Sequence, residues 1–377
     1  MTSFPPPEQV FAVAPPGLEP ALEAEAKALG LLPRRVEGGV ELGGVVGLHQ
    51  EFNLRLRTAS RVLLRLGRFH APDVAALTRG LAGLDLARVW NGKETPRLAV
   101  SAHGSRVPGN AVASVVARAW GLSSVGHVGA LDEEEGDGLT LLIRLDGPEC
   151  TVSVDTSGEP LHRRGYRQEI GRAPLRETLA AGILQLAGYD GMEPLVDPMC
   201  GSGTFLIEGA WISMRRAPGL ERRFAFERFP RFEPAAWAER QARARMEALP
   251  APRSELHGFD INAGALGTAR RNARRAGLTL ALERRDVKTL QAPGARPGLV
   301  VANPPYGKRV GEGSELPELY RALGATLRRS FPGWRAALLV PDEAGLIREL
   351  GLRDVKSLKV RNGGLRCRLL LSSPLSP

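Results

Sequence analysis

The chain has 377 residues, of which 43% are hydrophobic, so it is long enough to bury two or three ordinary cores. It has no run of 18 apolar residues and no charged start followed by an apolar run, which argues against a membrane-spanning or secreted protein and leads us to expect a cytoplasmic one. The formal net charge of +10 is uneven, because residues 1–160 carry −4 and residues 161–377 carry +14, and this favours a polyanionic partner for the second part.

The three cysteines, Cys150, Cys200 and Cys367, form no CxxC pair and show no metal-binding spacing. We therefore expect neither a disulfide framework nor a metal site.

Short strands and one helix are expected at the beginning of the chain. The apolar pattern predicts a helix over 20–29 and strands over 10–13, 36–42 and 61–66. This order is typical of a small α+β, ferredoxin-like unit, which we assign to residues 1–70.

Arginines are frequent at the end of this unit, at positions 55, 57, 61, 65 and 68. The alternation over 54–57 predicts a strand with Arg55 and Arg57 on one face. Two interpretations are about equally good. Either Arg57 and Arg61 contact RNA, or these arginines form a face that is simply solvated.

The next segment, 71–158, continues the α+β pattern, with strands expected at 97–102, 139–145 and 150–155 and a helix through 112–119. It contains no catalytic spacing, so it is a better candidate for binding than for chemistry.

A basic segment follows at 161–167 and reads Leu-His-Arg-Arg-Gly-Tyr-Arg. Arg163, Arg164 and Arg167 could hold phosphate, and Tyr166 could stack on a base. A merely hydrophilic linker is the alternative. His162 has no acid or nucleophile pattern beside it, so we do not expect it to be catalytic.

A strand, a glycine-rich turn and a helix start are expected over 195–208. Gly201 and Gly203 let a backbone approach a ligand closely, and Asp197 at the strand end can hold an ammonium or hydroxyl group. The third glycine of the dinucleotide fingerprint is absent, because Leu206 stands there.

Two more acids follow predicted strands. Asp260 is suited to bridging two ribose hydroxyls, and Asp286 stands where an adenine amino group would find an acceptor. Between the glycine turn and Asp260 the chain is too long for a compact nucleotide-binding unit, so an insertion is expected at about 212–254. Its arginines alternate with phenylalanines, which suits either single-stranded RNA or packing of the rings onto the domain.

The most informative motif is Asn303, Pro304, Pro305 and Tyr306, at the end of an apolar strand. The nitrogen of an exocyclic amine is a poor nucleophile until acceptors hold both of its hydrogens. The Asn303 side-chain oxygen and the Pro304 carbonyl can do so, while the prolines fix the loop and Tyr306 offers a stacking face. With the three strand-end acids, the motif indicates an S-adenosylmethionine pocket beside an amine-methylating site.

A hairpin around 362–364, expected after the strand at 336–340, favours the seven-strand methyltransferase sheet over an ordinary Rossmann sheet. Cys200 suggests a competing role as nucleophile for carbon methylation, but it lies in the cofactor loop and the target-side motif has no cysteine.

Taken together, the motifs at 161–167, 197–204 and 303–307 resemble those of the bacterial THUMP-domain RNA guanine-N2 methyltransferases, most closely the branch acting on large-subunit (23S) ribosomal RNA. The resemblance covers nearly the whole chain. It implies an α/β class I, Rossmann-like methyltransferase domain at 159–377, preceded by the ferredoxin-like unit and a THUMP RNA-binding domain at 71–158.

The resemblance also assigns roles to residues. The cofactor-binding residues would be Asp197, Pro198, Gly201, Gly203, Thr204, Asp260, Asp286, Asn303 and Thr178. The residues around the target base would be Asn303, Pro304, Pro305 and Tyr306. From the basic residues themselves, and not from the resemblance, we expect RNA to be held by Arg57, Arg61, Arg163, Arg164, Tyr166, Arg167, Lys308 and Arg309.

We therefore expect an S-adenosylmethionine-dependent enzyme that makes N2-methylguanosine in 23S rRNA, without a metal and more readily as a monomer than as an oligomer. The alternatives are the same chemistry on tRNA, adenine-N6 methylation of DNA, and a non-catalytic RNA-binding module.

Overall fold

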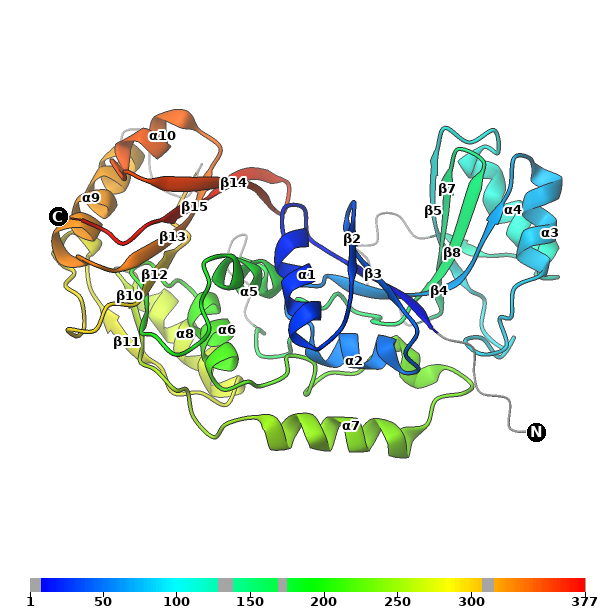
Figure 1. Cartoon of the computed structure of the whole chain (residues 1–377), viewed down its shortest axis with the longest axis horizontal. Coiled ribbons are helices and arrows are strands. Elements are labelled where there is room, and N and C mark those ends of the chain that lie inside the picture. Colours follow the sequence, from blue (N-terminus) through cyan, green and yellow to red (C-terminus); the bar gives the residue numbers. More distant parts are fainter. Residues whose placement is uncertain (1–7, 128–137, 169–174, 307–314, 377) are drawn as a thin grey trace.

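The structure is a computed structural model that describes residues 8–127, 138–168, 175–306 and 315–376. These residues form two sheets, one of eight strands and one of seven. Figure 1 shows the seven-stranded sheet with its helices on the left, and the other sheet running from the middle of the molecule to a lobe on the right.

The eight-stranded sheet has, in spatial order, strands β2 (Arg34–Val36), β3 (Gly39–Gly43), β1 (Gln9–Val13), β4 (Arg61–His70), β8 (Glu149–Asp155), β7 (Thr140–Asp146), β5 (Arg97–His103) and β6 (Gly126–His127). Strand β4 is the longest of them and pairs with β1 near its start and with β8 along most of its length. The two expected N-terminal units therefore share one continuous sheet, and the boundary between residues 70 and 71 remains a prediction.

The helices of this half are α1 (Glu19–Ala28), α2 (Leu48–Arg55), α3 (Val74–Ala82) and α4 (Gly109–Ala119). Two local predictions are wrong. The strand expected over 36–42 is a hairpin of β2 and β3, because Gly38 adopts a left-handed φ of 78° and turns the chain. The strand expected over 54–57 is the end of α2, so Arg55 and Arg57 do not share a strand face.

The seven-stranded sheet has, in spatial order, β11 (Ala281–Arg284), β10 (Leu256–Asp260), β9 (Leu195–Asp197), β12 (Leu299–Ala302), β13 (Arg335–Pro341), β15 (Leu365–Ser372) and β14 (Val355–Asn362). The first five strands are parallel, and β15 runs antiparallel to both β13 and β14. This is the expected seven-strand arrangement with a terminal hairpin, and the predicted fold class is confirmed.

Helices cover both faces of this sheet. The helices and 3-10 turns of this half of the chain are α5 (Glu177–Leu186), α6 (Thr204–Ser213), η1 (Ala225–Arg228), α7 (Pro234–Glu247), α8 (Ala263–Arg275), η2 (Val287–Thr289), α9 (Glu315–Ser330) and α10 (Ala344–Glu349), of which η1 and α7 pack on the N-terminal half. One core joins the sheet to α5, α6 and α8, and a second core on the other face joins it to α9 and α10. The result is a three-layer α/β domain.

The two halves are packed into each other. Leu18, from the N-terminal half, is fully buried in the core formed by α5, α6 and the seven-stranded sheet. In the other direction, Phe224, Phe226 and Trp237 of the insertion belong to the core of the N-terminal half. The rings of Phe226 and Trp237 meet edge to face with centroids 5.0 Å apart. These insertion aromatics are therefore packing residues rather than a stacking surface for bases.

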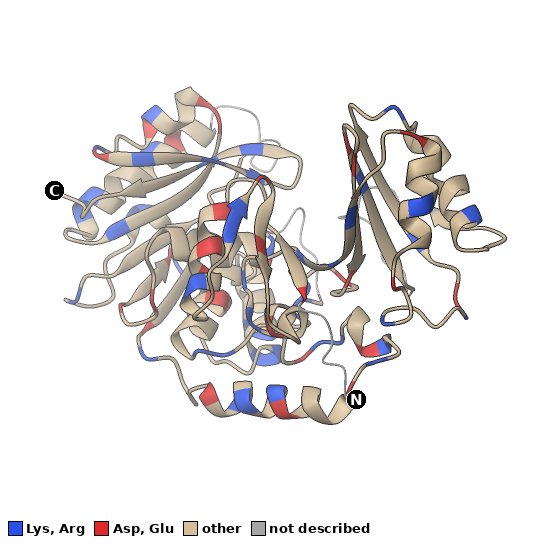
Figure 2. Cartoon of the chain, turned by 45° about the vertical axis from the view of Figure 1, so that its right-hand side comes forward, with Lys and Arg blue, Asp and Glu red and all other residues tan. Residues whose placement is uncertain are grey.

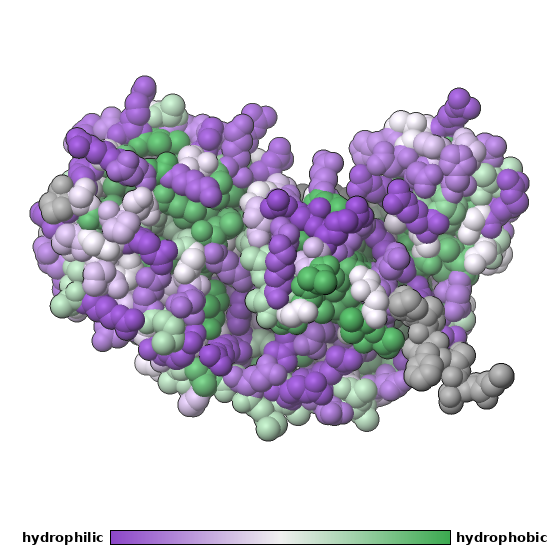
Figure 3. Space-filling view, in the orientation of Figure 1, coloured by the Kyte–Doolittle hydropathy of each residue, from purple (hydrophilic) through white to green (hydrophobic). Residues whose placement is uncertain are grey.

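The surface is mixed in character. Helix α7 lies along the lower edge of the molecule in Figure 1 and carries both positive and negative side chains along its length in Figure 2. Figure 3 shows a largely hydrophilic face, with apolar side chains in small patches and a notch between the right-hand lobe and the centre. In the described part of the chain, no helix is long and apolar enough to span a membrane.

Candidate active site

The glycine-rich turn connects β9 to α6 at the carboxyl edge of the sheet. Gly201 and Gly203 both have left-handed backbones, with φ of 52° and 83°. A Cβ added at Gly201 would meet no atom within 4 Å, so this part of the loop borders open space. A Cβ at Gly203 would come within 3.2 Å of Ala269 on α8, so this glycine also lets the turn pack on that helix. The loop thus presents bare backbone to a ligand, as the sequence predicts.

Three carboxylates lie where β9, β10 and β11 end. Asp260 accepts hydrogen bonds from the backbone N–H of Gly201 (2.9 Å) and of Asn262 (2.8 Å), so it also anchors the glycine turn. Asp286 accepts from the N–H of Lys288 at 2.9 Å. Because these three strands are parallel neighbours, the acids share one edge of the sheet, and the geometry agrees with a shared site.

Asp197 is the most buried of the three acids, with 2% of its surface exposed. Burial raises the pKa of Asp197 well above its ordinary value, and the nearby Asp260 raises it further. The hydrogen bond from the N–H of Met199 opposes this shift. A cationic ligand group beside it would favour the ionised form.

Cys200 is buried in the same turn. Burial and the neighbouring acids Asp197 and Asp260 raise the pKa of its thiol strongly, so the thiolate needed for nucleophilic attack is disfavoured. The structure therefore argues against a nucleophilic cysteine.

The Asn303 to Tyr306 segment follows β12, in the middle of the sheet. The side-chain Oδ1 of Asn303 is buried and has no hydrogen-bond partner among the described residues. A buried acceptor without a partner is costly and needs an explanation, and a ligand that donates a hydrogen bond would provide one. Tyr306 is 5% exposed, and its hydroxyl accepts a hydrogen bond from Asn362. Lys308 and Arg309, which were predicted to bind RNA, lie outside the described residues.

A cleft of about 700 Å³ opens beside Tyr306. Its walls come from the 159–168 segment, the start of α5, the insertion and the β14–β15 hairpin. Its cationic lining residues are Arg163, Arg164, Arg167, Arg176, Arg222 and Arg223, against the acids Glu159, Glu177 and Glu221. His162 also lines the cleft, and burial together with nearby arginines lowers its pKa to about 3, so the imidazole is neutral. The cleft is thus positively charged and lies against the methylation motif.

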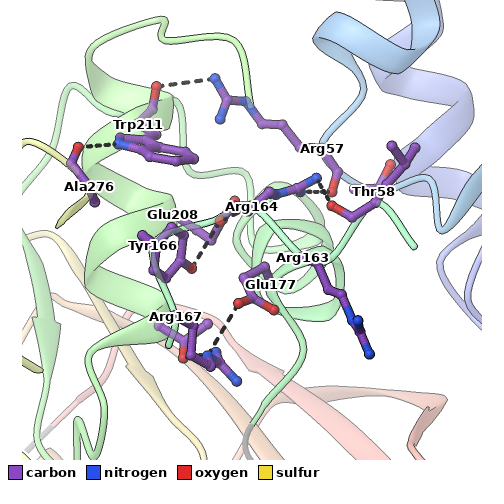
Figure 4. A network of polar contacts seen from close by, with 12 residues as sticks. Arg57, Thr58, Arg163, Arg164, Tyr166, Arg167, Glu177, Glu208, Trp211 and Ala276 are labelled. Atoms are coloured by element: carbon purple, nitrogen blue, oxygen red, sulfur yellow. Dashed lines mark hydrogen bonds and ion pairs between the residues drawn. The ribbon is translucent and has the colours of Figure 1, made fainter. Parts of the chain in front are cut away.

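A buried ionic network runs behind this cleft and is drawn in Figure 4. Arg164 lies 3.6 Å from Glu208 of α6, and the hydroxyl of Tyr166 donates to the same carboxylate at 3.2 Å. Arg167 lies 3.2 Å from Glu177 and donates to Thr204 Oγ1 at 2.6 Å. The 161–167 segment therefore holds the first turn of α6, which follows the glycine loop directly.

Four residues predicted to bind RNA are in the interior instead. Arg57 donates to the backbone carbonyls of Trp211 and Arg216, and Arg61 forms an ion pair with Asp155. Arg57, Arg61, Arg164 and Tyr166 are all less than 10% exposed. Because these side chains are buried and held by intramolecular partners, we assign them a packing role in place of the predicted RNA contact, and Arg164 in addition lines the cleft. Two of them join the halves of the chain, since Arg57 donates to the carbonyls of Trp211 and Arg216, and Arg164 donates to the carbonyl of Arg57.

Two predicted residues keep their place at the cleft. Arg163 is exposed there, and Arg167 is partly buried with Thr204 and Glu177 as partners. Thr178 is buried in the first turn of α5. Asn362 was not among the predicted site residues, and its contact with Tyr306 joins residues 56 positions apart. No local sequence pattern signals such a contact.

The strand order, the glycine turn with its strand-end acids and the Asn-Pro-Pro-Tyr segment define a class I methyltransferase. Two family models match the chain: the RMKL-like methyltransferase domain over residues 164–370 and the RlmL ferredoxin-like domain over residues 9–63. The chain belongs to the RMKL-like methyltransferase family.

Individual proteins agree with this assignment. The ribosomal RNA large subunit methyltransferase K/L of Methylococcus capsulatus is 37% identical over 376 residues, covering 96% of this chain and 50% of that protein. The chain thus spans about half the length of the curated relatives it matches.

Two solved structures share the fold over almost the whole chain. The structure of SMU.472 in complex with SAH superposes with a TM-score of 0.86 at 27% identity, covering 99% of this chain and 100% of that one. A protein from Listeria monocytogenes, described as a predicted N6-adenine-specific DNA methylase, gives 0.85 at 28% identity, covering 98% and 97%.

Proposed function

We propose that this chain binds S-adenosylmethionine at the glycine turn and transfers its methyl group to the N2 amine of a guanine in large-subunit ribosomal RNA. Family membership and the names of the curated relatives support this proposal. The observation that carries the chemistry is the buried, unpartnered Oδ1 of Asn303, in the same segment as Tyr306, which lines the cationic cleft.

The described residues fit the cofactor. The open space at Gly201 gives a ligand access to backbone, and Asp260 retains acceptor capacity for ribose hydroxyls beyond its two backbone hydrogen bonds. Asp286 would serve the adenine, and Asp197 would meet a cationic group. Pro198, Thr204 and Thr178 would complete the pocket.

S-adenosylmethionine would supply a methyl group on a positively charged sulfonium, from which a neutral thioether departs readily. The guanine amine would attack the methyl carbon in line, so that an N–C bond forms as the S–C bond breaks and one amine proton passes to water. Asn303 Oδ1 and the Pro304 carbonyl would each accept one N–H and so aim the nitrogen lone pair at the methyl group. Pro305 would fix the loop, and Tyr306 would stack on the extruded base.

RNA would approach through the cleft, where Arg163 and Arg223 are the more exposed cations. The N-terminal half, including residues 71–158 as a THUMP domain, would position the substrate. We propose that the chain works in the cytoplasm as a monomer. Light scattering of the purified protein would test the oligomeric state.

The test is nucleoside mass spectrometry after the purified chain has been incubated with S-adenosylmethionine and unmethylated large-subunit rRNA transcribed in vitro. N2-methylguanosine in that RNA is the expected product. Parallel reactions contain tRNA transcripts and duplex DNA of the same total length. Methylation confined to tRNA, or N6-methyladenine in the DNA, would replace the proposed substrate with one of these alternatives.

A further inference from the structure

The tip of the β14–β15 hairpin forms part of the cleft wall. Asn362 pairs with Leu365 across a two-residue turn, in which Gly363 adopts a φ of 59°. Asn362, Gly363 and Leu365 line the cleft together with Tyr306. A secondary-structure element far from the methylation motif in sequence therefore meets it at the site.

The meeting point is a hydrogen bond between two buried side chains. The Nδ2 of Asn362 donates to the hydroxyl of Tyr306 at 2.5 Å, and Asn362 is only 9% exposed. Tyr306 follows two prolines, which have no N–H and cannot anchor this loop through backbone donation. The hydroxyl of Tyr320 comes no closer than 3.5 Å to the Pro305 carbonyl, which is a weak contact. Side-chain contacts such as that of Asn362 must therefore contribute to the orientation of the Tyr306 ring.

The hairpin is firmly held at its other contacts. Strand β15 pairs with β13 in the middle of the domain, and Val360 of β14 lies in the same core as Leu18 of the N-terminal half. The backbone at Gly17, with a φ of 92°, lies so close to Lys359 that a Cβ there would be 2.3 Å from the Lys359 carbonyl oxygen. Asn362 therefore extends from a strand that is packed against both halves of the chain.

We propose that Asn362 is a positioning residue: it fixes the Tyr306 ring in the orientation that receives the target base, and through β14 it links that orientation to the docking of the N-terminal half. This inference rests on the proposed function, and it adds a residue outside the Asn-Pro-Pro-Tyr segment. Asn362 itself makes no contact with the reacting atoms in this scheme.

A double-mutant cycle tests the proposal. The variants are Asn362→Ala, Tyr306→Phe, which keeps the ring and removes the hydroxyl, and the combination of both. Each single variant should lower the single-turnover rate of methyl transfer at saturating RNA by about tenfold, and the double variant should fall within about twofold of either one. Cofactor affinity should not change. Ser357→Ala, on the same strand but away from the cleft, is the matched control and should transfer methyl at the wild-type rate.

Two further measurements separate the possible outcomes. If Asn362→Ala folds poorly, Asn362→Asp replaces it. This variant keeps the shape of the side chain but can only accept a hydrogen bond, which the Tyr306 hydroxyl can donate. Its rate of methyl transfer should therefore be close to that of the wild type. The same cycle in urea unfolding reports the contact without any RNA. If the wild-type chain methylates no RNA, the proposed function fails while non-additive unfolding still supports the contact. Additive effects on both rate and stability would overturn the role of Asn362 and leave the proposed function standing.

Discussion

Asp260 offers the sharpest test of the cofactor site. Its carboxylate accepts hydrogen bonds from the N–H groups of Gly201 and Asn262, so Asp260→Ala removes both the predicted ribose contact and the anchor of the glycine turn. A hydrogen bond to a charged group contributes about 1.5–3 kcal/mol. One such bond to the ribose corresponds to a loss of about 10- to 150-fold in affinity for S-adenosylmethionine.

Isothermal titration calorimetry of S-adenosylmethionine binding measures this loss directly. Asp260→Asn keeps one side-chain oxygen as an acceptor and should lose less affinity than Asp260→Ala. Asp190→Ala is the matched control. Asp190 also accepts a hydrogen bond from the backbone N–H two residues later, but it is exposed and precedes β9 instead of following it. Wild-type affinity in a folded Asp260→Ala protein would refute the assignment of this edge of the sheet as the cofactor site.

Three further predictions follow from the site and the contacts behind it. Burial, opposed chiefly by Arg167, raises the pKa of Glu177 to about 7, above its unfolded value of 4.5. The folded state therefore holds a proton that the unfolded state releases, so the free energy of unfolding should fall as the pH rises from about 4.5 to 7. Glu177→Gln should flatten that dependence in urea titrations across this range, and an unchanged slope would argue against the buried carboxyl. Arg57→Ala should lower the free energy of unfolding by about 2–4 kcal/mol, because it leaves two carbonyls without their donor at the junction of the halves. A loss below about 0.5 kcal/mol in chemical unfolding would show that Arg57 does not stabilise this junction. Tyr306→Ala should weaken binding of the target base by about 1–3 kcal/mol and also slow methyl transfer. Titrations with RNA under single-turnover conditions measure both effects. If the rate depends on RNA concentration as in the wild type, Tyr306 does not stack on the base.

The sequence predicted those parts of the site that depend on where parallel strands end. Asp197, Asp260 and Asn303 follow apolar runs, and the carboxyl ends of parallel strands meet at one edge of the sheet. Their proximity could therefore be inferred without coordinates. The hairpin at 362–364 was predictable from local sequence, because two adjacent glycines between two predicted strands favour a tight turn.

The fate of the arginines could not be predicted in this way. An arginine in an alternating pattern can face either solvent or another domain, and the pattern is the same in both cases. Arg57 and Arg164 both donate to backbone carbonyls of the other half of the chain, and Arg164 also lies 3.6 Å from Glu208 of its own half. The phenylalanines of the insertion present the same ambiguity, since Phe226 packs into a core that also contains Val10 and Leu54 of the N-terminal half, far away in the sequence.

In the proposed mechanism, Asn303 activates an exocyclic amine for methyl transfer. The direct test is single-turnover methyl transfer to large-subunit rRNA at saturating RNA and cofactor. It compares the wild type with Asn303→Ala and with Asn91→Ala, since Asn91 is an exposed asparagine of the N-terminal half. We expect Asn303→Ala to reduce the rate by about a hundredfold or more with nearly unchanged affinity for cofactor and RNA, and Asn91→Ala to keep the wild-type rate. A wild-type rate for Asn303→Ala would contradict amine methylation at this site.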